Sequence, residues 1–254
     1  MILRDGQYVK MDDRRKLLGI IPARAGSKGL PNKNIKDFCG KPLIEWTFQA
    51  VKQAKVLNDV ILTSDSEVAI KIAKNYEIEV PFIRPRDLSG DNSEMRDVIR
   101  HALEFMRDSG REYTDVMILQ PTSPFRSAED IDSAWNSFHD SNAKTLLSVT
   151  EAGKYASNFM YKQLAEIDSN SVALSSLNGK SLLPIRRQDL EATWWRNGSI
   201  YICKSENITN LNQIIVEPII GHVMPWIRSV NIDDEQDLFY AEYIWNSAQL
   251  ENGL

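Results

Sequence analysis

The feature that most constrains this chain is an apolar run, Leu17–Ile21, that breaks at Pro22 into a glycine-bearing, cation-rich loop reaching Asn34. The run is short enough to be a buried strand, and the proline and glycines mark the loop. In open α/β sheets, such loops meet nucleotides at the C-terminal edge, because glycine lets backbone N–H groups approach phosphate oxygens. The chain is therefore expected to fold around this strand and to bind an anion beside it.

The charge distribution supports an anionic ligand. Between residues 14 and 41 the sequence has eight lysines and arginines and one acid, Asp37, whereas the whole chain has a formal net charge of -5. The overall acidity argues against a nucleic-acid scaffold, which would spread basic residues over a face. We therefore expect the basic patch to bind a small anion and expect no nucleic-acid partner.

Composition and cysteine usage narrow the class further. The chain is 43% hydrophobic, enough for one large α/β domain at 16–254, with residues 1–15 expected to be a flexible extension. Cys39 and Cys203 lie far apart in neither metal-ligand nor redox spacing, which suits a reducing cytoplasm. No apolar run approaches the roughly 20 residues of a membrane span, and the first residues lack a signal-peptide core, so no membrane partner is expected.

Short apolar runs alternate with amphipathic segments. Strands are expected at Leu17–Ile21, Asp59–Thr63, Val80–Ile83, Asp115–Leu119, Thr145–Val149 and Ser199–Cys203, with weaker strand patterns at Ile214–Ile220 and His222–Ile227. Helices are expected at Pro42–Val56, in the segment ending near Asn75, and at Ser93–Arg107, Ala128–Phe138 and Asp234–Asn246. Strands separated by such helices are typical of parallel crossovers in a doubly wound sheet.

Residues 153–192 interrupt this alternation. They are polar, are broken by residues such as Gly153, Gly179 and Pro184, and follow neither the helical nor the strand period. A segment of this length inside a compact domain is typical of an arm, a lid or an interface rather than a loose loop.

Seven blocks of the sequence carry a resemblance. They are Ile21–Asn34 (IPARAGSKGLPNKN), Gly40–Thr47 (GKPLIEWT), Thr63–Ser66 (TSDS), Arg84–Leu88 (RPRDL), Leu119–Arg126 (LQPTSPFR), Arg196–Tyr201 (RNGSIY) and Ser229–Leu238 (SVNIDDEQDL). In this order the chain resembles the acylneuraminate cytidylyltransferases, or CMP-sialic acid synthetases. The blocks span most of the chain outside residues 1–15 and the irregular segment.

The resemblance implies a fold and an activity. The fold is a Rossmann-like nucleotidyltransferase, with a mostly parallel central sheet, helices on both faces, and 153–192 as an inserted dimerisation and sugar-site arm of a homodimer. The activity is magnesium-dependent (or dependent on another divalent cation) transfer of CMP from CTP to the anomeric hydroxyl of an acidic 2-keto-3-deoxy sugar. Pyrophosphate is released, in the cytoplasm, for cell-surface glycan biosynthesis.

The first loop also bears on which sugar is used. The octulosonate family lacks the S-K-G-L-P-x-K-N pattern, and pseudaminate-specific relatives look more like S-K-R-I-P at this point. Gly29 and Leu30 therefore favour a nine-carbon sugar of the sialate or legionaminate type. The alternatives are another 2-keto-3-deoxy acid sugar, or a catalytically silent nucleotide-binding relative.

The first loop has the groups that a triphosphate needs. A triphosphate carries roughly four negative charges, and nucleotidyl transfer depends on positioning and on fixed cations and N–H donors. We assign the phosphates and a catalytic role to Arg24 and Lys28, and by resemblance we place Asn34 against the cytidine. The predicted nucleotide site is Ala23, Arg24, Gly26, Ser27, Lys28, Gly29, Lys33, Asn34, Arg84 and Ser93.

The predicted sugar site combines two later blocks. Gln120 follows the central strand in a loop that two prolines hold rigid. The sugar carboxylate needs a cation, and Arg186, Arg187 or Arg196 could pair with it through two parallel bonds. By resemblance the site is Gln120, Thr122, Ser123, Arg187, Arg196, Asn197 and Gly198.

The predicted metal site departs from the family pattern. That pattern is D-I-D near the C-terminal helix, with two carboxylates on one face of a strand, which suits magnesium. Here the first position is Asn231 and only Asp233, the third predicted catalytic residue, keeps its charge. We therefore expect an active enzyme that needs relatively high magnesium, and a silent relative is the alternative.

Other chemistries lack their motifs. The G-x-x-x-x-G-K-[ST] phosphate loop is absent, as is the G-G-x-G-T-R-type loop of sugar-1-phosphate nucleotidyltransferases. No zinc spacing, catalytic cysteine or Ser-His-Asp order is visible. His101, His139 and His222 lie away from every block and are predicted to be non-catalytic.

Overall fold

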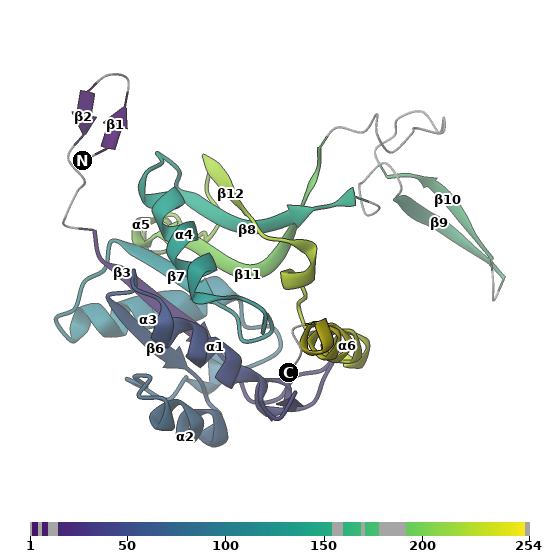
Figure 1. The fold of residues 1–254 in the computed structure, drawn as a ribbon, viewed down its shortest axis with the longest axis horizontal. Helices are drawn as coiled ribbons and strands as arrows, with labels where there is room; N and C mark the ends of the chain where they lie inside the picture. The colour runs from purple at the N-terminus through teal and green to yellow at the C-terminus, as the bar shows by residue number, and fades with distance from the viewer. Residues whose placement is uncertain are drawn as a thin grey trace.

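The computed structural model describes residues 2–4, 7–9, 15–153, 160–168, 171–177 and 192–251 (Figure 1). Its centre is a six-stranded sheet with the strand order β12-β8-β11-β7-β3-β6. The strands are β3 (Leu17–Pro22), β6 (Asp59–Thr63), β7 (Asp115–Leu119), β8 (Thr145–Glu151), β11 (Trp194–Lys204) and β12 (Ile219–Val223). Because β3 is parallel to β6 and β7, and β12 is parallel to β8, the predicted mostly parallel sheet is confirmed.

β11 is the exception, since it runs antiparallel to both β7 and β8. The predicted succession of parallel crossovers is therefore wrong at this strand. A parallel neighbour needs a crossover connection, usually a helix. Between β8 and β11 lies the arm segment, residues 153–192, and its described residues contain no α-helix. β11 accordingly enters the sheet from the opposite end.

Helices cover both faces of the sheet (Figure 1). They are α1 (Leu43–Gln53), α2 (Glu67–Asn75), α3 (Met95–Asp108), α4 (Ala128–His139), α5 (Ser205–Thr209) and α6 (Glu235–Glu251). One buried cluster joins α1, α2 and α4 to the sheet, and a second joins α3 and α5 to its other face. Ser66 caps α2, because its hydroxyl accepts a hydrogen bond from the N–H of Ala69.

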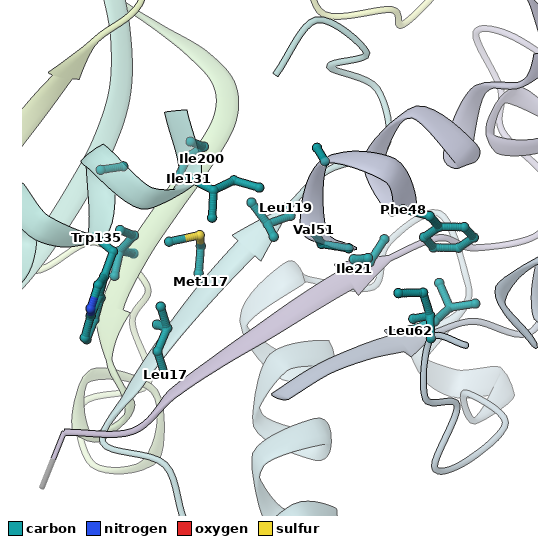
Figure 2. Packing of buried hydrophobic residues seen from close by; sticks show 14 of the residues in the cluster. Leu17, Ile21, Phe48, Val51, Leu62, Met117, Leu119, Ile131, Trp135 and Ile200 are labelled. Atoms are coloured by element: carbon teal, nitrogen blue, oxygen red, sulfur yellow. The ribbon is translucent and has the colours of Figure 1, made fainter. Parts of the chain in front are cut away.

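Alternation along the central strands explains the two layers. Leu17 and Ile21 of β3 belong to the cluster of α1 and α4, whereas Leu18 and Ile20 belong to the cluster of α3. Figure 2 shows the first face, where Trp135 of α4 lies beside the strands. Because β3 is buried on both sides, its sequence is continuously apolar, and only the loop after it reaches solvent.

Three strand predictions need correction. Residues 79–83 make only isolated bridges, which join Glu79 to Ile61 and Ile83 to Ser64. The run predicted at 214–220 becomes a strand only from Ile219, and the run predicted at 222–227 ends in a 3-10 helix. Shorter elements are β4 (Asp37–Phe38), β5 (Lys41–Pro42) and the 3-10 helices at Lys33–Ile35, Arg86–Leu88 and Trp226–Arg228.

The arm segment contains regular structure that its sequence pattern does not indicate. β9 (Tyr161–Asp168) and β10 (Ser171–Ser176) form an antiparallel hairpin that pairs with no other described strand and lies away from the central sheet in Figure 1. Register shifts break the hairpin's alternation, which explains the missing period. Within the predicted N-terminal extension, β1 (Ile2–Arg4) and β2 (Gln7–Val9) likewise form their own pair.

Candidate active site

The C-terminal end of β3 and the loop that follows β7 border a cavity of about 410 Å³. Eleven of its lining residues were predicted from the sequence to bind nucleotide, sugar or metal. Together they are Arg24, Ser27, Lys28, Gly29, Lys33, Asn34, Arg84, Ser93, Gln120, Thr122 and Asp233. The fold thus brings the first loop, the block after β7 and the segment before α6 to one place.

Two hydrogen bonds between side chains and the loop backbone shape the first loop. The N–H of Ala25 donates to Oδ1 of Asp65 at 2.6 Å, and the Asn34 amide donates to the Arg24 carbonyl at 3.1 Å. Gly26 has a φ of 67°, which favours glycine. Asn34 therefore braces the loop as well as lining the cavity. Ala23, predicted at the nucleotide, is buried and continues the strand by donating to Thr63.

Gly29 is where the first loop meets the segment before α6. A Cβ at Gly29 would lie 2.5 Å from the backbone oxygen of Asp233, so no larger residue fits without a shift. The Lys33 ammonium donates to Oδ1 of Asp233 at 2.6 Å, and the Asn231 amide donates to its Oδ2 at 2.5 Å. Both oxygens of the predicted metal ligand are thus engaged by the chain.

One acid joins the two cations predicted to bind phosphate. Arg24 contacts Oδ1 of Asp91 at 2.7 Å, and Lys28 contacts Oδ2 at 3.0 Å. Hydrogen bonds from Arg24 and then Lys28 hold the pKa of the Asp91 carboxyl below its usual range. Sequence reasoning missed Asp91, and the only signal for it was an acid in the glycine- and serine-rich loop that precedes the α3 pattern.

Arg84 is a buried cation in the wall of this cavity. The residue is 5% exposed, and its guanidinium donates to both the hydroxyl and the carbonyl of Thr63. Burial lowers the pKa of Arg84 to about 10, which still leaves it charged at neutral pH. A fixed, largely desolvated cation of this kind suits an anionic or polar ligand.

A second cavity, of about 550 Å³, adjoins the first and shares Gln120 and Asp233 with it. Its other described lining residues are Thr150, Trp195, Arg196, Asn197, Gly198, Tyr201, Trp226, Ser229, Val230, Asn231, Asp237 and Tyr240. Predicted sugar residues from β11 therefore face the predicted metal residues. The Arg196 guanidinium lies over the Tyr201 ring at 5.7 Å. Arg186 and Arg187 lie outside the described residues.

Asn197 and Gly198 shape this wall in different ways. Asn197 is 5% exposed, its Oδ1 accepting from the Ser148 hydroxyl at 2.5 Å and its amide donating to Ser229 at 2.9 Å. The side chain is therefore committed to joining β8, β11 and the segment after β12. Gly198 has a φ of 78°, which favours glycine, and a Cβ there would lie 3.8 Å from Oδ1 of Asn231.

The loop carrying Gln120 is held by an arginine that the sequence analysis did not single out. Arg126 is 3% exposed and donates to the carbonyls of Gln120 and Ser199 at 3.0 and 2.9 Å, and to the Thr47 hydroxyl at 2.6 Å. It thereby ties the loop to β11 and α1. Ser123 is 1% exposed and lines neither cavity, so its place is structural support.

The remaining titratable groups lie elsewhere. The described lining of the two cavities contains no histidine and no cysteine. Burial raises the pKa of the Cys203 thiol to about 12 and that of Cys39 to about 11, so both are unreactive at neutral pH. No group of three or more metal-binding side chains occurs among the residues that the structure describes, and no described helix has the length and apolarity to cross a bilayer.

Comparison with known proteins gives consistent matches. The family model described as cytidylyltransferase matches residues 18–229. The chain is 30% identical to a pseudaminic acid cytidylyltransferase of Campylobacter jejuni, covering 91% of this chain and 96% of that one. It is 32% identical to a CMP-N,N'-diacetyllegionaminic acid synthase of Legionella pneumophila, covering 89% and 95%. It is 31% identical to an N-acylneuraminate cytidylyltransferase of Escherichia coli, covering 90% of this chain but 52% of that one.

Solved structures agree on the fold. A CMP:2-keto-3-deoxy-manno-octonic acid synthetase complexed with CTP matches with a TM-score of 0.67 and 16% identity, over 92% of this chain and 99% of that one. A cytidylyltransferase from Leptospira borgpetersenii matches with a TM-score of 0.54 and 15% identity, over 90% and 86%. At these identities the likeness supports the nucleotidyltransferase fold alone.

Proposed function

The chain belongs to the cytidylyltransferase family, and from that premise we propose that it transfers CMP from CTP to the anomeric hydroxyl of a nine-carbon ulosonic acid, releasing pyrophosphate. The observation that carries this proposal is the junction of two cavities at Gln120 and Asp233. One cavity is lined by cations suited to a triphosphate. The other is large enough for an acidic sugar and has an arginine in its wall.

The geometry supports direct transfer. CTP occupies the first cavity with its phosphates on Arg24 and Lys28, so the α-phosphorus lies toward the junction. The sugar occupies the second cavity, and its hydroxyl attacks that phosphorus in line while pyrophosphate leaves toward the cations. Arg24, Lys28 and the buried Arg84 stabilise the charge that builds on the leaving group. No covalent enzyme intermediate is needed.

The described residues fit a magnesium ion that shares its ligands with the substrate. Magnesium sites often combine one or two protein oxygens with phosphates and water. Asp233 offers a carboxylate, and the Oδ1 atom of Asn231 is buried without a hydrogen-bond partner within the described chain. The ion would neutralise phosphate charge, and it would compete with Lys33 for Asp233. Asn231 adds no charge, so magnesium should bind weakly until CTP is present.

The sugar class follows from the first loop and from the second cavity. The tight approach of Gly29 to Asp233 leaves no room for the arginine of the S-K-R-I-P pattern, which supports a sialate or legionaminate substrate. Arg196 is the described cation in the wall that suits the sugar carboxylate. We further propose a cytoplasmic homodimer, with residues 153–192 as its arm and with neither nucleic-acid nor membrane partners.

The deciding experiment measures pyrophosphate release from CTP, UTP, ATP or GTP with magnesium and a panel of sialate, legionaminate, pseudaminate and octulosonate acids. We expect release with CTP and a nine-carbon acid, because an unpaired buried group at a wrong base costs about 1–3 kcal/mol. Equal rates with ATP would contradict the cytidylyltransferase assignment. Calorimetric CTP binding without turnover on any sugar would instead favour the silent relative.

A further inference from the structure

The loop between the 3-10 helix at Arg86–Leu88 and α3 contributes a carboxylate to the cavity of about 410 Å³. Because the proposed function places CTP there, we call it the nucleotide cavity. Gly90, Asp91 and Ser93 all line it. The loop is a compact turn, since the Ser93 hydroxyl donates to the Asp87 carbonyl at 2.9 Å and the Ser93 N–H donates to the Gly90 carbonyl. The carboxylate of Asp91 therefore comes from a shaped segment that faces the first loop.

This carboxylate occupies both cations that the proposed function gives to the triphosphate. Its two oxygens divide between Arg24 and Lys28, at 2.7 and 3.0 Å. Carboxylate and phosphate oxygens are the same kind of acceptor for guanidinium and ammonium groups. A triphosphate that reaches these cations must therefore displace Asp91, or lie beside it and meet its negative charge.

We propose that Asp91 is an internal anion, which holds Arg24 and Lys28 while the cavity is empty, yields them to the triphosphate of CTP, and takes them back as pyrophosphate leaves. This inference rests on the proposed function. Asp91 lowers the affinity for CTP and, by the same competition, for pyrophosphate. It thereby limits product retention at a site whose strong positive charge would otherwise hold a polyanion.

The size of the effect is bounded by exposure. The side chains of Lys28 and Asp91 are 79% and 38% exposed, so their pair is largely solvated. Removing the charge of Asp91 should therefore tighten polyphosphate binding by about three- to tenfold rather than by orders of magnitude. The difference should shrink at high salt, because exposed charges are screened.

The test compares wild type with Asp91→Asn by isothermal titration calorimetry, using inorganic pyrophosphate, tripolyphosphate and CTP at low and high salt. Asp91→Asn should bind all three about fivefold more tightly at low salt, and the inhibition constant of pyrophosphate in turnover should fall by a similar factor. Asp87→Asn is the matched control, since its exposed carboxylate lies in the same loop region but outside the cavity lining, and it should leave all three affinities unchanged. Asp91→Ser, with melting curves for every variant, guards against a defect specific to asparagine.

Each outcome decides between two statements. Equal or weaker polyphosphate binding by both Asp91 variants, with unaltered melting, would overturn the internal-anion role and make Asp91 a group that orients Arg24. If wild type binds the inorganic polyphosphates but not CTP, the proposed function fails while the competition at Arg24 and Lys28 is still measured. Binding of none of the three anions by any variant overturns the inference.

Discussion

At the scale of single residues, the cations of the nucleotide cavity are oriented by acids that the chain itself supplies. Lys33 is held by Asp233, and Arg24 by Asp91. A side chain held in place loses less conformational freedom when a ligand binds. The ligand must, however, displace the acid that already pairs with the cation. Lys28, the most exposed of the three, is the least constrained before binding.

Replacing either Arg24 or Lys28 by alanine tests the assigned phosphate contacts. Each variant loses a charge-assisted hydrogen bond worth about 1.5–3 kcal/mol, so turnover should fall by about tenfold to a hundredfold without loss of fold. Pyrophosphate release and thermal melting measure the two effects. The control is Lys52→Ala on α1, which breaks an exposed ion pair between Lys52 and Glu77. Near-normal turnover in both loop variants would make the loop structural only.

His222 of β12 predicts part of the pH dependence of stability. Burial lowers the pKa of His222 below 6.5. The negative charge of Asp130 raises this pKa and the positive charge of Arg228 lowers it, but both effects are smaller than that of burial. The unfolded chain takes up this proton first as pH falls. The contribution of the neutral imidazole is thus complete above about pH 6.5 and is lost as pH falls through the depressed value.

His222→Gln should therefore lose less stability than wild type on acidification. Urea unfolding at pH values of about 7.5 and about 5 gives the free energy of unfolding of each protein, and the difference between pH values is the quantity compared. If the free energy of unfolding decreases equally in the two proteins on acidification, then His222 has the same pKa in the folded and the unfolded chain.

At the scale of elements, the site depends on two segments that meet without sharing a sheet. The loop after β3 and the segment before α6 approach so closely at Gly29 that only a hydrogen fits. Behind them, Leu30 and Ile232 belong to one buried cluster with Leu238 and Ala241 of α6. The packing of α6 therefore sets where Asp233 lies relative to the loop after β3.

The magnesium dependence that we propose gives a test of the proposed metal residues. Asp233→Asn should reduce turnover by about a hundredfold or more, because it removes the charged ligand, whereas Asn231→Asp should be active at lower magnesium. Pyrophosphate release against magnesium concentration measures both effects. Magnesium-dependent CTP affinity, measured by calorimetry without sugar, separates ligand loss from a defect in chemistry. Full activity in Asp233→Asn would remove Asp233 from the site.

At the scale of the whole molecule, the arm hairpin exposes apolar side chains. Those exposed between residues 160 and 177 are Met160, Tyr161, Leu164, Ile167, Val172, Leu174 and Leu177. Trp194 and Trp195 of β11 are also exposed, at 51% and 44%. A set of this size on one arm is typical of an interface, and closed dimers are the commonest way to cover it.

The proposed dimer predicts a definite hydrodynamic result. Wild type should sediment as a dimer at micromolar concentration, and the double variant Leu164→Glu with Ile167→Glu should raise the dissociation constant by about a hundredfold or more, since two carboxylates would be buried. Val68→Glu on α2, an exposed apolar position outside the arm, is the control and should remain dimeric. A monomeric wild type would contradict the dimer.

Local sequence patterns predict the central strands of the sheet and most of the residues at its edge. Asp59–Thr63 and Asp115–Leu119 were predicted with their observed bounds, because each is a short apolar run bounded by polar residues. Segments that follow parallel strands emerge at one edge of the sheet, which is why Arg24 after β3 and Gln120 after β7 line one cavity. Arg84 joins them although the residues before it form only isolated bridges. These signals are local, and the sequence shows them directly.

Which distant groups meet depends on how the elements pack, and local patterns do not show it. The antiparallel entry of β11, the arm hairpin, the pairing of Asp91 with Arg24, and the fit of Gly29 against Asp233 have no local signature. Arg126, buried between the Gln120 loop, β11 and α1, belongs with them. Each joins segments far apart in the chain, and their separation is set by how the helices and the sheet pack. A residue's type fixes what it can bind, whereas packing fixes which partner is within reach.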